Sequence, residues 1–285
     1  MTKQQHDLTR ILTLRDEFRR RDTHVVAVVI AKGISQRFPR KNLTPICGRP
    51  LVEWSLVQAL CSHLVTETYL STDDEEIASI GRRLGVPVIW RYELGEGVAG
   101  NVVLAHAIHQ VREWHPIDIF LGFLPTNPLK QPWDIDECTW RYWDMRKRHR
   151  DCRVVNPLAS QLETVIHKRL DDERSVTIVG DKHSHYMDAT AACWSASDPD
   201  WYLWMTESCA RTDANVPDLE VNLDGHPAPF TENVNYYYQV EHFQRFDLDL
   251  PEQLPVIESI MEKHILSEGA DVYERYKAQG QKGTT

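Results

Sequence analysis

Positively charged side chains gather in one short segment near the N-terminus, AKGISQRFPRKNL at residues 31–43. Gly33 in this segment lacks a side chain, which lets the backbone approach a phosphate group closely. The segment also offers a hydroxyl and four cations, which are Ser35, Lys32, Arg37, Arg40 and Lys41. These residue types fit the triphosphate of a nucleotide, although a solvated basic turn has the same composition. The segment has neither the GxxxxGK pattern of a P-loop nor the GxGxxG pattern of a dinucleotide-binding fold.

Two carboxylates lie two positions apart near the C-terminus, in the segment FDLDLP at residues 246–251. In an extended segment, residues i and i+2 project to the same face, so Asp247 and Asp249 would point the same way. Two such carboxylates can hold Mg²⁺ against phosphate oxygens, because this hard cation prefers oxygen ligands. Acidic residues just before a helix also favour its N-terminus, and that simpler role stays open.

Smaller groups of polar residues follow other apolar stretches. Thr72 and Asp73 lie in STDDEEI at residues 71–77, a segment that also resembles a capping box opening a helix. Arg91 follows a short apolar stretch, and it could face an anionic ligand or simply lie on the surface. Residues 124–130, LPTNPLK, taken alone are typical of a turn bounded by prolines.

The elements that must position these residues alternate between strands and helices. Residues 25–31 form a continuous apolar, β-branched run, which predicts a strand buried on both faces. Further strands are predicted at residues 68–71, 86–90 and 117–124, and helices at residues 5–21, from about 50, 72–84, 100–113 and 133–150. This alternation predicts an α/β fold with a doubly wound, mostly parallel sheet. Ligands bind such sheets at the carboxyl ends of the strands, where the basic segment lies.

The alternation changes after about residue 151. Short strands are predicted at residues 153–156, 164–167, 175–179 and 190–195, which together indicate an antiparallel insertion. A strand at 236–240 and a helix at 251–265 then return to the core. We therefore predict an N-terminal helix (1–24), a nucleotide-binding core (25–150), an insertion (151–235), a C-terminal part of the core (236–268) and a flexible tail (269–285).

Composition limits the class of protein. The chain has 285 residues, 42% of them hydrophobic, and a formal net charge of −10, which argues against a general nucleic-acid surface. It contains no apolar run long enough to predict a membrane span, and its charged N-terminus does not resemble a secretory signal. The six cysteines have no CxxC spacing and predict reduced thiols rather than a zinc site. We expect a cytoplasmic protein with no membrane or nucleic-acid partner.

The basic segment resembles the N-terminal signature of the acylneuraminate cytidylyltransferase family, whose members activate sialic, legionaminic and 3-deoxy-octulosonic acids with CTP. That signature reads approximately ARGGSKRIPxKNL. The residues that match it in order, without a gap, are Ala31, Gly33, Ser35, Arg37, Pro39, Lys41, Asn42 and Leu43. The departures are Lys32 for arginine, Ile34 for glycine and Gln36 for lysine. The first departure keeps the charge but loses the two-pronged hydrogen bonding of arginine.

Other stretches resemble the same family. STDDEEI is similar to a family segment after the second strand, and Arg91 stands where the family has an arginine. Residues 124–130 resemble LQPTSPLR, with Leu124 in place of a glutamine that lies near the acceptor sugar. Asp247 and Asp249 resemble a D-I-D motif that precedes a closing helix. By eye, the resemblance covers residues 25–265.

The resemblance implies a Rossmann-like nucleotidyltransferase that joins an acceptor hydroxyl to the α-phosphate of CTP and releases pyrophosphate. The acceptor would be a small acidic sugar of nonulosonic type, and a homodimer would form through residues 151–230. The residues implied for nucleotide binding are Lys32, Gly33, Ser35, Arg37, Lys41, Asn42, Thr72 and Asp73. Those implied on the acceptor side are Arg91, Thr126, Asn127 and Lys130. Mg²⁺ would be held by Asp247 and Asp249, and the catalytic groups would be Lys41, Arg37 and Asp249.

Other functions stay open at the level of sequence. Another nucleoside triphosphate, such as GTP, could replace CTP, and the acceptor could be a phosphonate or a phosphate. A glycosyltransferase also uses an Asp-x-Asp metal pair, although there the pair usually follows a strand in the middle of the chain. The departures at Ile34, Gln36 and Leu124 also leave open a homologue that binds nucleotide without catalysis.

Overall fold

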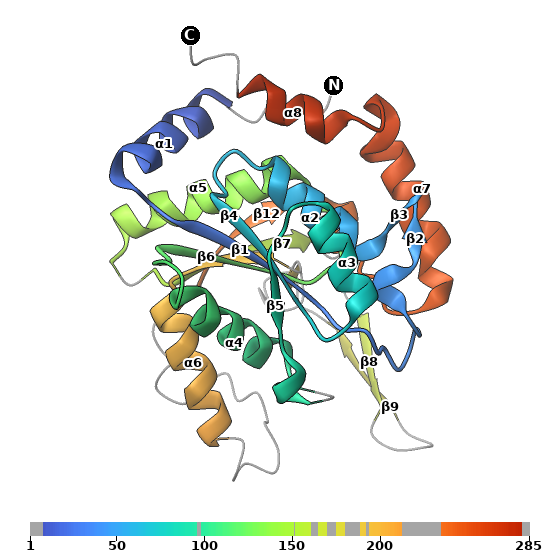
Figure 1. Cartoon of the computed structure of the whole chain (residues 1–285). Helices are drawn as coiled ribbons and strands as arrows, with labels where there is room; N and C mark the ends of the chain where they lie inside the picture. The colour runs from blue at the N-terminus through green and yellow to red at the C-terminus, as the bar shows by residue number, and fades with distance from the viewer. Residues whose placement is uncertain are drawn as a thin grey trace.

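A computed structural model of the chain describes residues 8–95, 98–150, 152–160, 165–169, 175–179, 189–191, 194–212 and 235–280. Its centre is one mixed sheet with strand order β10-β7-β11-β6-β1-β4-β5, to which β12 is added by pairing with β7 (Figure 1). Helices cover both faces of this sheet. The prediction of an α/β fold with a mostly parallel sheet is confirmed.

The parallel part of the sheet comes from the first half of the chain. It consists of β1 (Val25–Ala31), β4 (Glu67–Thr72), β5 (Val88–Trp90) and β6 (Ile119–Phe123). β1 pairs in parallel with β4 on one side and with β6 on the other. Every residue of β1 is buried, as expected for a β-branched strand that is covered on both faces.

Alternate residues of β1 enter two different hydrophobic cores. The covering helices are α1 (Leu8–Arg21), α2 (Leu51–Cys61), α3 (Glu75–Arg83), α4 (Gly100–Arg112), α5 (Pro132–Arg148) and α6 (Pro199–Thr212). Val25, Ala27 and Val29 pack in one cluster with residues of α1, α2 and α5. Val26 and Val28 pack in a second cluster with residues of α4 and α6, which lie side by side in Figure 1.

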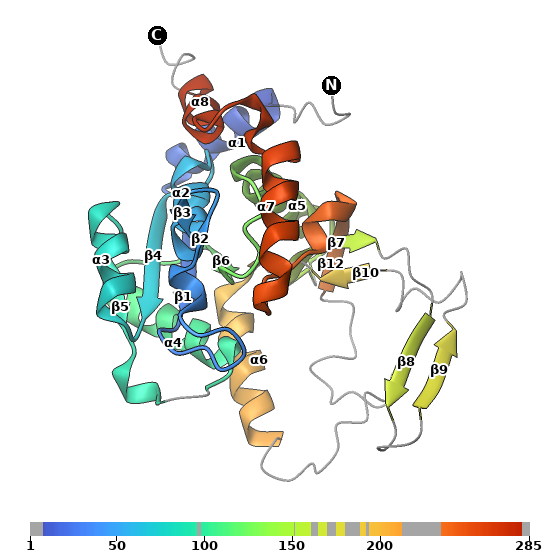
Figure 2. The same cartoon turned by 90° about the vertical axis from the view of Figure 1, so that its right-hand side faces the viewer.

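The second half of the chain extends the sheet with strands that are mostly antiparallel. β11 (Trp194–Ser197) pairs antiparallel with β6 and with β7 (Val154–Ser160), and β10 (Ala189–Ala191) pairs antiparallel with β7. β12 (Asn235–Val240) runs parallel to β7. β8 (Val165–Arg169) and β9 (Ser175–Val179) form a separate hairpin, set apart from the central sheet in Figure 2. The five-part division of the chain stays a prediction, and β7, β10 and β11 share one sheet with the core strands.

A third core cluster fixes the C-terminal helices. α7 (Leu254–His264) and α8 (Val272–Gln279) pack there with α2 and with β2 (Pro45–Ile46), which pairs with β3 (Arg49–Pro50). Leu248 is fully buried in the same cluster. Its burial anchors the segment that carries Asp247 and Asp249.

The structure corrects the sequence predictions at two helices. The sequence predicts an antiparallel insertion without a helix at residues 151–235, whereas α6 begins at Pro199, because proline suits the first turn of a helix. The sequence also predicts a flexible tail, whereas α8 is a helix that buries Val272, Tyr273 and Tyr276. Residues 281–285 of that tail lie outside the described residues. Among the helices that the structure describes, none is long and apolar enough to cross a membrane.

Candidate active site

The carboxyl ends of β1 and β6 meet where the strand order reverses. From β1 the chain proceeds to β4 and β5 on one side, and then crosses to β6 on the other side of β1. In open α/β sheets, such a reversal leaves a crevice in which ligands bind. The loop after β1 (residues 32–40) and the loop after β6 (residues 124–131) both leave the sheet at this edge.

The loop after β1 begins with residues that alternate between inside and outside. Gly33 and Ser35 are buried, whereas Lys32, Ile34 and Gln36 are exposed. The positions that depart from the family signature are therefore the exposed ones. The inward-facing residues of the loop keep the types that the signature has.

Gly33 lies against the start of α3. Its N–H donates a hydrogen bond to Asp73 Oδ1 at 2.8 Å. A Cβ atom at position 33 would lie 2.5 Å from Asp74 Oδ2. Asp74 cannot move away freely, because it caps α3 by accepting a hydrogen bond from Ile77 N–H. The close approach of this loop to α3 therefore requires a glycine.

The sequence pattern predicts that Thr72 opens α3 as a capping box, and this prediction is wrong by two residues. Asp74 is the N-cap, and the buried Thr72 hydroxyl accepts a hydrogen bond from Asp74 N–H at 3.2 Å. Thr72 and Asp73 thus brace the turn between β4 and α3, which in turn supports Gly33. The predicted nucleotide-side residues Gly33, Thr72 and Asp73 form one connected group.

Arg40 ties the far end of the same loop to α3. It has a left-handed backbone, with φ of 58°, and its guanidinium pairs with Asp74 at 2.5 Å and with Glu76. Partial burial raises the pKa of Asp74, but hydrogen bonds from Ile77 and Arg40 outweigh it and lower the pKa overall. Arg40 therefore acts on the shape of the loop. From the sequence, Arg40 was expected to be one more cation for phosphate.

The structure brings the loop after β1 against the C-terminal carboxylate. Lys41 Nζ donates to Asp249 Oδ1 at 3.0 Å, across 208 positions of sequence. Arg37 Nη2 lies 3.2 Å from Asp249 Oδ2. The hydrogen bond from Lys41 is the largest cause that lowers the pKa of Asp249, and the charge of Arg37 adds to it. Asp249 is therefore ionised at neutral pH, and the three residues predicted to be catalytic meet at one point.

Burial alternates along residues 247–249. Leu248 is buried, and its N–H donates to Thr126 O at 2.8 Å. Asp247 and Asp249 are both partly exposed. This alternation agrees with the prediction that the two carboxylates share a face. The same hydrogen bond joins the Asp pair to the loop after β6.

Asn42 closes the loop after β1. Its side chain is 5% exposed, and its amide donates to Lys32 O at 2.8 Å. Lys41 to Leu43 form a short 3₁₀ turn that Arg40 precedes. In this structure Asn42 therefore shapes the loop, and its predicted contact with the nucleotide stays a prediction.

Buried polar atoms at the ends of three neighbouring strands have no hydrogen-bond partner among the described residues. They are Ser35 Oγ after β1, Ser71 Oγ in β4 and Arg91 Nε after β5. A buried polar group without a partner costs free energy, so each atom indicates a ligand or a water that bonds to it. Ser71 is a candidate site residue that was not predicted from the sequence, because β4, ETYLST, has several polar residues and nothing in it singles out Ser71.

Arg91 lies deeper than a surface arginine. It is 6% exposed, and its Nη2 lies 3.4 Å from Asp73 Oδ2. Burial lowers the pKa of Arg91, and the charge of Asp73 opposes that shift. An anion placed beside Arg91 would compensate this buried cation, which is consistent with the predicted role in binding an acidic acceptor.

Asn127 and Lys130 are buried within the loop after β6. Asn127 donates to Gln244 O at 2.6 Å and accepts from Leu129 N–H at 3.0 Å. Lys130 Nζ donates to Ser55 Oγ at 2.8 Å and to Asn127 O at 2.9 Å. Both side chains therefore hold the loop in place, whereas Thr126 is partly exposed. Direct contact of Asn127 and Lys130 with an acceptor stays a prediction.

The residues at the Asp pair fit a hard divalent cation. Carboxylate oxygens are the ligands that Mg²⁺ prefers, and Asp249 is kept ionised by its two basic partners. The unpartnered Ser35 hydroxyl lies in the loop that bears these basic residues. The donors at this edge thus suit a metal together with an anionic ligand.

The sequence of the chain matches a known protein family. A family model described as cytidylyltransferase matches residues 26–275, which include both the loop after β1 and the Asp pair. The chain belongs to the cytidylyltransferase family. The resemblance of the sequence motifs is thereby confirmed, and the inward-facing motif residues lie at the reversal of the strand order.

Curated relatives are similar to the chain over part of its length. The pseudaminic acid cytidylyltransferase of Campylobacter jejuni is 40% identical over 108 residues, which are 36% of this chain and 47% of the relative. The CMP-N,N'-diacetyllegionaminic acid synthase of Legionella pneumophila is 29% identical over 38% of this chain and 48% of its own. The N-acylneuraminate cytidylyltransferase A of Danio rerio is 28% identical over 42% of this chain and 27% of its own. The chain thus spans less than half the length of these relatives.

Solved structures share the fold. A CMP:2-keto-3-deoxy-manno-octonic acid synthetase in complex with CTP superposes with a TM-score of 0.59 at 16% identity, covering 85% of this chain and all of that one. A cytidylyltransferase from Leptospira borgpetersenii superposes with a TM-score of 0.55 at 16% identity, covering 91% of this chain and 94% of that one. At such low identity, these likenesses show the fold alone.

Proposed function

We propose that this cytidylyltransferase transfers CMP from CTP to a hydroxyl group of a nonulosonic acid or a related sugar acid, with release of pyrophosphate. The contact of Lys41 and Arg37 with Asp249 carries the proposal. It joins a loop suited to phosphates with a carboxylate suited to a metal, at the edge where ligands bind this kind of sheet. The relatives named for pseudaminic, legionaminic and acylneuraminic acids support the class of acceptor.

The loop after β1 would hold the triphosphate. Its proposed phosphate ligands are Lys32, Gly33, Ser35, Arg37 and Lys41. Transfer of a phosphoryl group asks a protein chiefly for positioning and for charge stabilisation. Lys41 is better positioned than Arg37, since its side chain is 12% exposed against 69% for Arg37. We therefore place Lys41 at the α-phosphate and Arg37 toward the leaving pyrophosphate.

The Asp pair would hold Mg²⁺, which when bound supplies positive charge at the phosphate oxygens and lowers the pKa of the acceptor hydroxyl. The chain's own residues prepare this site. Lys41 and Arg37 keep Asp249 ionised, and the burial of Leu248 fixes the segment between the two carboxylates. Asn42, Thr72 and Asp73 would support the nucleotide side through the loop contacts described above.

The acceptor would lie between the ends of β5 and β6. Arg91 and Thr126 are the proposed contacts, because Arg91 is a buried cation with an unpartnered Nε and Thr126 is partly exposed. We place Asn127 and Lys130 behind this surface, where they hold the loop after β6. Leu124 is 39% exposed at the start of that loop, so an apolar side chain would meet the acceptor where the family has a glutamine.

Pyrophosphate release measured across a matrix of substrates tests the proposal. CTP, UTP, GTP and ATP are each combined with pseudaminic, legionaminic and N-acetylneuraminic acids, 3-deoxy-octulosonic acid, and phosphate and phosphonate acceptors. We expect release with CTP and at least one of the sugar acids. Release with GTP but not with CTP would show that the nucleotide is GTP. Release with a phosphonate but with no sugar acid would show that the acceptor is a phosphonate. No release with any combination would contradict the proposed activity.

A homodimer and a cytoplasmic location stay predictions. Much of the segment 151–230, which was expected to form the dimer interface, lies outside the described residues. Sedimentation equilibrium of the full chain measures the oligomeric state directly. A mass twice that of the chain, 33.1 kDa, would agree with the expected homodimer.

A further inference from the structure

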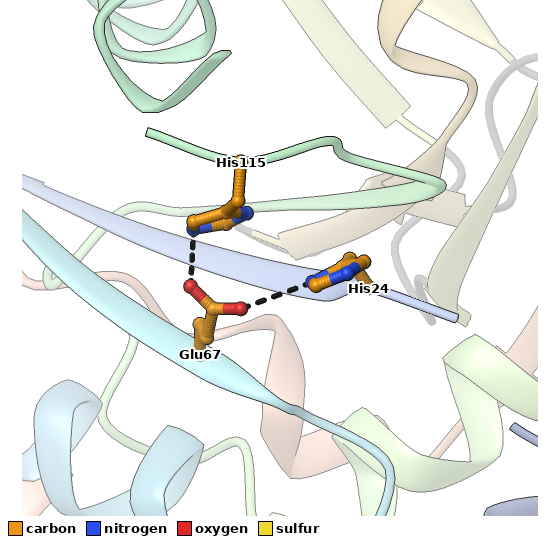
Figure 3. A group of neighbouring side chains, drawn as sticks. All are labelled: His24, Glu67 and His115. Atoms are coloured by element: carbon orange, nitrogen blue, oxygen red, sulfur yellow. Dashed lines mark hydrogen bonds and ion pairs between the residues drawn. The ribbon is translucent and has the colours of Figure 1, made fainter. Parts of the chain in front are cut away.

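A second cluster of polar side chains lies at the amino ends of the central strands, on the side opposite to the candidate active site. These strand ends are called the amino edge below, and the carboxyl ends with their loops are called the carboxyl edge. His24 directly precedes β1, Glu67 begins β4, and His115 lies between α4 and β6 (Figure 3). Because β6, β1 and β4 are neighbours in the sheet, their amino ends emerge next to one another. Within the described residues, this is the group of three potential metal ligands whose donor atoms all lie within 4.8 Å of one another.

The three side chains point toward one another (Figure 3). His24 Nδ1 lies 3.1 Å from Glu67 Oε1, and His115 Nε2 contacts Glu67 Oε2. The two imidazole rings are stacked, with their centroids 5.2 Å apart. Ligand atoms at about 2.1 Å from a tetrahedral zinc ion stand about 3.4 Å from one another. Small side-chain adjustments would therefore place all three donors on one ion.

Backbone hydrogen bonds hold these strand ends together. His24 N–H donates to Asp118 Oδ2 at 2.7 Å, and His24 O accepts from the N–H groups of Asp118 and Ile119 at 3.0 and 3.1 Å. Thr66 N–H donates to Val25 O at 2.9 Å. The amino ends of β1, β4 and β6 therefore form a rigid frame. Strand ends place side chains more accurately than loops do, which applies here to His24 and Glu67.

The hydrogen bonds of His115 fix which ring nitrogen can bind a metal. His115 Nδ1 lies 2.8 Å from Pro116 O, and a carbonyl oxygen can only accept, so Nδ1 carries the hydrogen. Nε2 of the neutral ring then presents a lone pair to Glu67. Metal-bound histidines commonly donate their other ring N–H to a backbone carbonyl in this way.

With a neutral His115, the cluster has too few hydrogens for its acceptors. The Tyr69 hydroxyl lies 2.9 Å from Glu67 Oε2 and 2.7 Å from His115 Nε2, but it has a single hydrogen to donate. Glu67 Oε2 and the lone pair of a neutral His115 Nε2 therefore share this single hydrogen, and these two acceptor atoms lie in contact with no hydrogen between them. A cation held by both would remove this conflict.

We propose that His24, Glu67 and His115 bind a zinc ion, in a second metal site at the amino edge of the sheet. Imidazole nitrogens with one carboxylate are a ligand set that Zn²⁺ favours, whereas Mg²⁺ takes oxygen ligands. Three protein ligands leave a fourth position for water or another ligand. His24 and Glu67 also line a surface cavity of about 430 Å³, which gives the ion and that fourth ligand a route to the site.

The bound ion would fasten three central strands at one edge. A metal that binds the folded chain alone stabilises it by mass action, so the site links zinc concentration to the stability of the sheet. A zinc site was not expected from the sequence, because the six cysteines lack the spacing of zinc ligands. The present ligands carry no local motif, since His24 and Glu67 are 43 positions apart and meet only in the folded sheet.

A proton is the alternative to a metal ion. A protonated His115 would donate from Nε2 to Glu67, and the cluster would then be a set of ion pairs without metal affinity. Direct metal binding separates the two. The full chain is stripped with EDTA, titrated with Co²⁺ as a spectroscopic probe, and then titrated with Zn²⁺. The same titration in the Asp247→Asn, Asp249→Asn double variant removes the candidate magnesium ligands.

We expect one equivalent of Co²⁺ with visible d–d absorption in the wild type and in the double variant, displaced by one equivalent of Zn²⁺. His115→Gln should weaken binding by more than about 100-fold, because loss of an outer-sphere partner alone weakens metal sites about 10- to 100-fold. His106→Gln is the matched control. His106 pairs with Glu93 at 2.7 Å but belongs to no group of three ligands within the described residues.

The melting temperature gives a second measurement. Zn²⁺ should raise it in the wild type and in His106→Gln, and should leave it unchanged in His115→Gln. Glu67→Gln, which has no negative charge to offer the ion, replaces His115→Gln if that variant does not fold. Absence of Co²⁺ absorption in the wild type would overturn the proposal. Equal metal affinity in the wild type and in both ligand variants would overturn it as well.

Discussion

The central strands begin at the amino edge, where the His24 cluster lies, and end at the carboxyl edge, where the candidate active site lies. The two regions are built differently. At the carboxyl edge, the strands continue into loops whose side chains reach across long stretches of sequence, as Lys41 reaches Asp249. At the amino edge, His24 and Glu67 extend directly from strand ends that backbone hydrogen bonds tie together. The carboxyl edge offers charged side chains on loops, whereas the amino edge offers three closely spaced metal-ligand atoms.

The difference follows from what each edge would bind. A nucleotide is large and must enter and leave, so loops that a scaffold positions suit it well. A single metal ion needs few ligands at accurate distances, which rigid strand ends provide. The comparison predicts that the two edges respond separately to mutation and to metals.

The largest expected effect comes from the carboxyl edge. Lys41→Ala removes the cation placed at the α-phosphate and the hydrogen bond that helps keep Asp249 ionised. We expect kcat/KM for CTP to fall by up to about 10³-fold, since one preorganised donor at a developing charge contributes about 10²- to 10³-fold. Lys263→Ala, an exposed lysine in the last turn of α7, is the control and should keep full activity. Turnover of Lys41→Ala near that of the wild type would remove Lys41 from the reaction.

Chelation should separate the two edges. EDTA is expected to abolish pyrophosphate release, and added Mg²⁺ should restore it, because the Asp pair offers oxygen ligands. His115→Gln should show the same loss and the same recovery, since its site lies at the opposite edge. Failure of added metal to restore activity in His115→Gln, with recovery in the wild type, would connect the amino edge to catalysis instead.

A smaller loss is expected when the shape of the loop after β1 is changed. In Gly33→Ala the new Cβ would lie 2.5 Å from the capping carboxylate of Asp74, so the loop must move. We expect kcat/KM for CTP to fall by about 10²-fold, the effect of misplacing reacting groups by about 1 Å. Gly100→Ala is the control, because its new Cβ would meet Ile30 at an ordinary 3.4 Å. Equal activity of the two variants would show that the close packing of Gly33 has no part in nucleotide binding.

The smallest expected effect is on stability, and it concerns Asp134, a buried residue of α5. Burial raises the pKa of Asp134 from 3.8 to about 7, although Gln244 donates to its carboxylate at 2.6 Å. The folded chain then binds this proton more tightly than the unfolded chain does. The contribution of Asp134 to stability therefore falls as the pH rises from about 4 to about 7, with a slope of up to about 1.4 kcal/mol per pH unit.

Urea unfolding at several pH values in this window measures that slope. Asp134→Asn cannot take up the proton, so its free energy of unfolding should depend less on pH than that of the wild type. The Asn127 amide donates to Gln244 O, so the same measurement reports on the support of the loop after β6. Identical slopes for the two proteins would show that Asp134 is charged in the folded state throughout the window.

The fold was predictable where a local pattern decides it. The apolar, β-branched run at residues 25–31 predicts β1 with the bounds that the structure has. The start of α3 was misplaced because Thr72 and Asp74 both suit a helix cap, and only the packed turn selects Asp74. α8 was missed because its polar sequence hides Tyr273 and Tyr276, which are buried against distant parts of the chain.

The candidate active site was predictable in its parts but not in its contacts. Residue types and family resemblance single out Lys41 and Asp249, whereas their hydrogen bond depends on the whole fold. The burial of Asn127 and Lys130 could not be read from a loop sequence rich in proline. The amino edge had no sequence signal at all, since Glu67 begins β4, His24 precedes β1 and His115 lies between α4 and β6, and these segments become neighbours only in the folded sheet.

Mass spectrometry of the product is the most direct test of CMP transfer from CTP to a sugar acid. The full chain is incubated with CTP, Mg²⁺ and each sugar acid, alongside Asp249→Asn and Lys263→Ala. We expect a conjugate of CMP with one sugar acid, formed together with an equal amount of pyrophosphate, in the wild type and in Lys263→Ala but not in Asp249→Asn. Free CMP without a conjugate, or equal conjugate formation by Asp249→Asn, would contradict it.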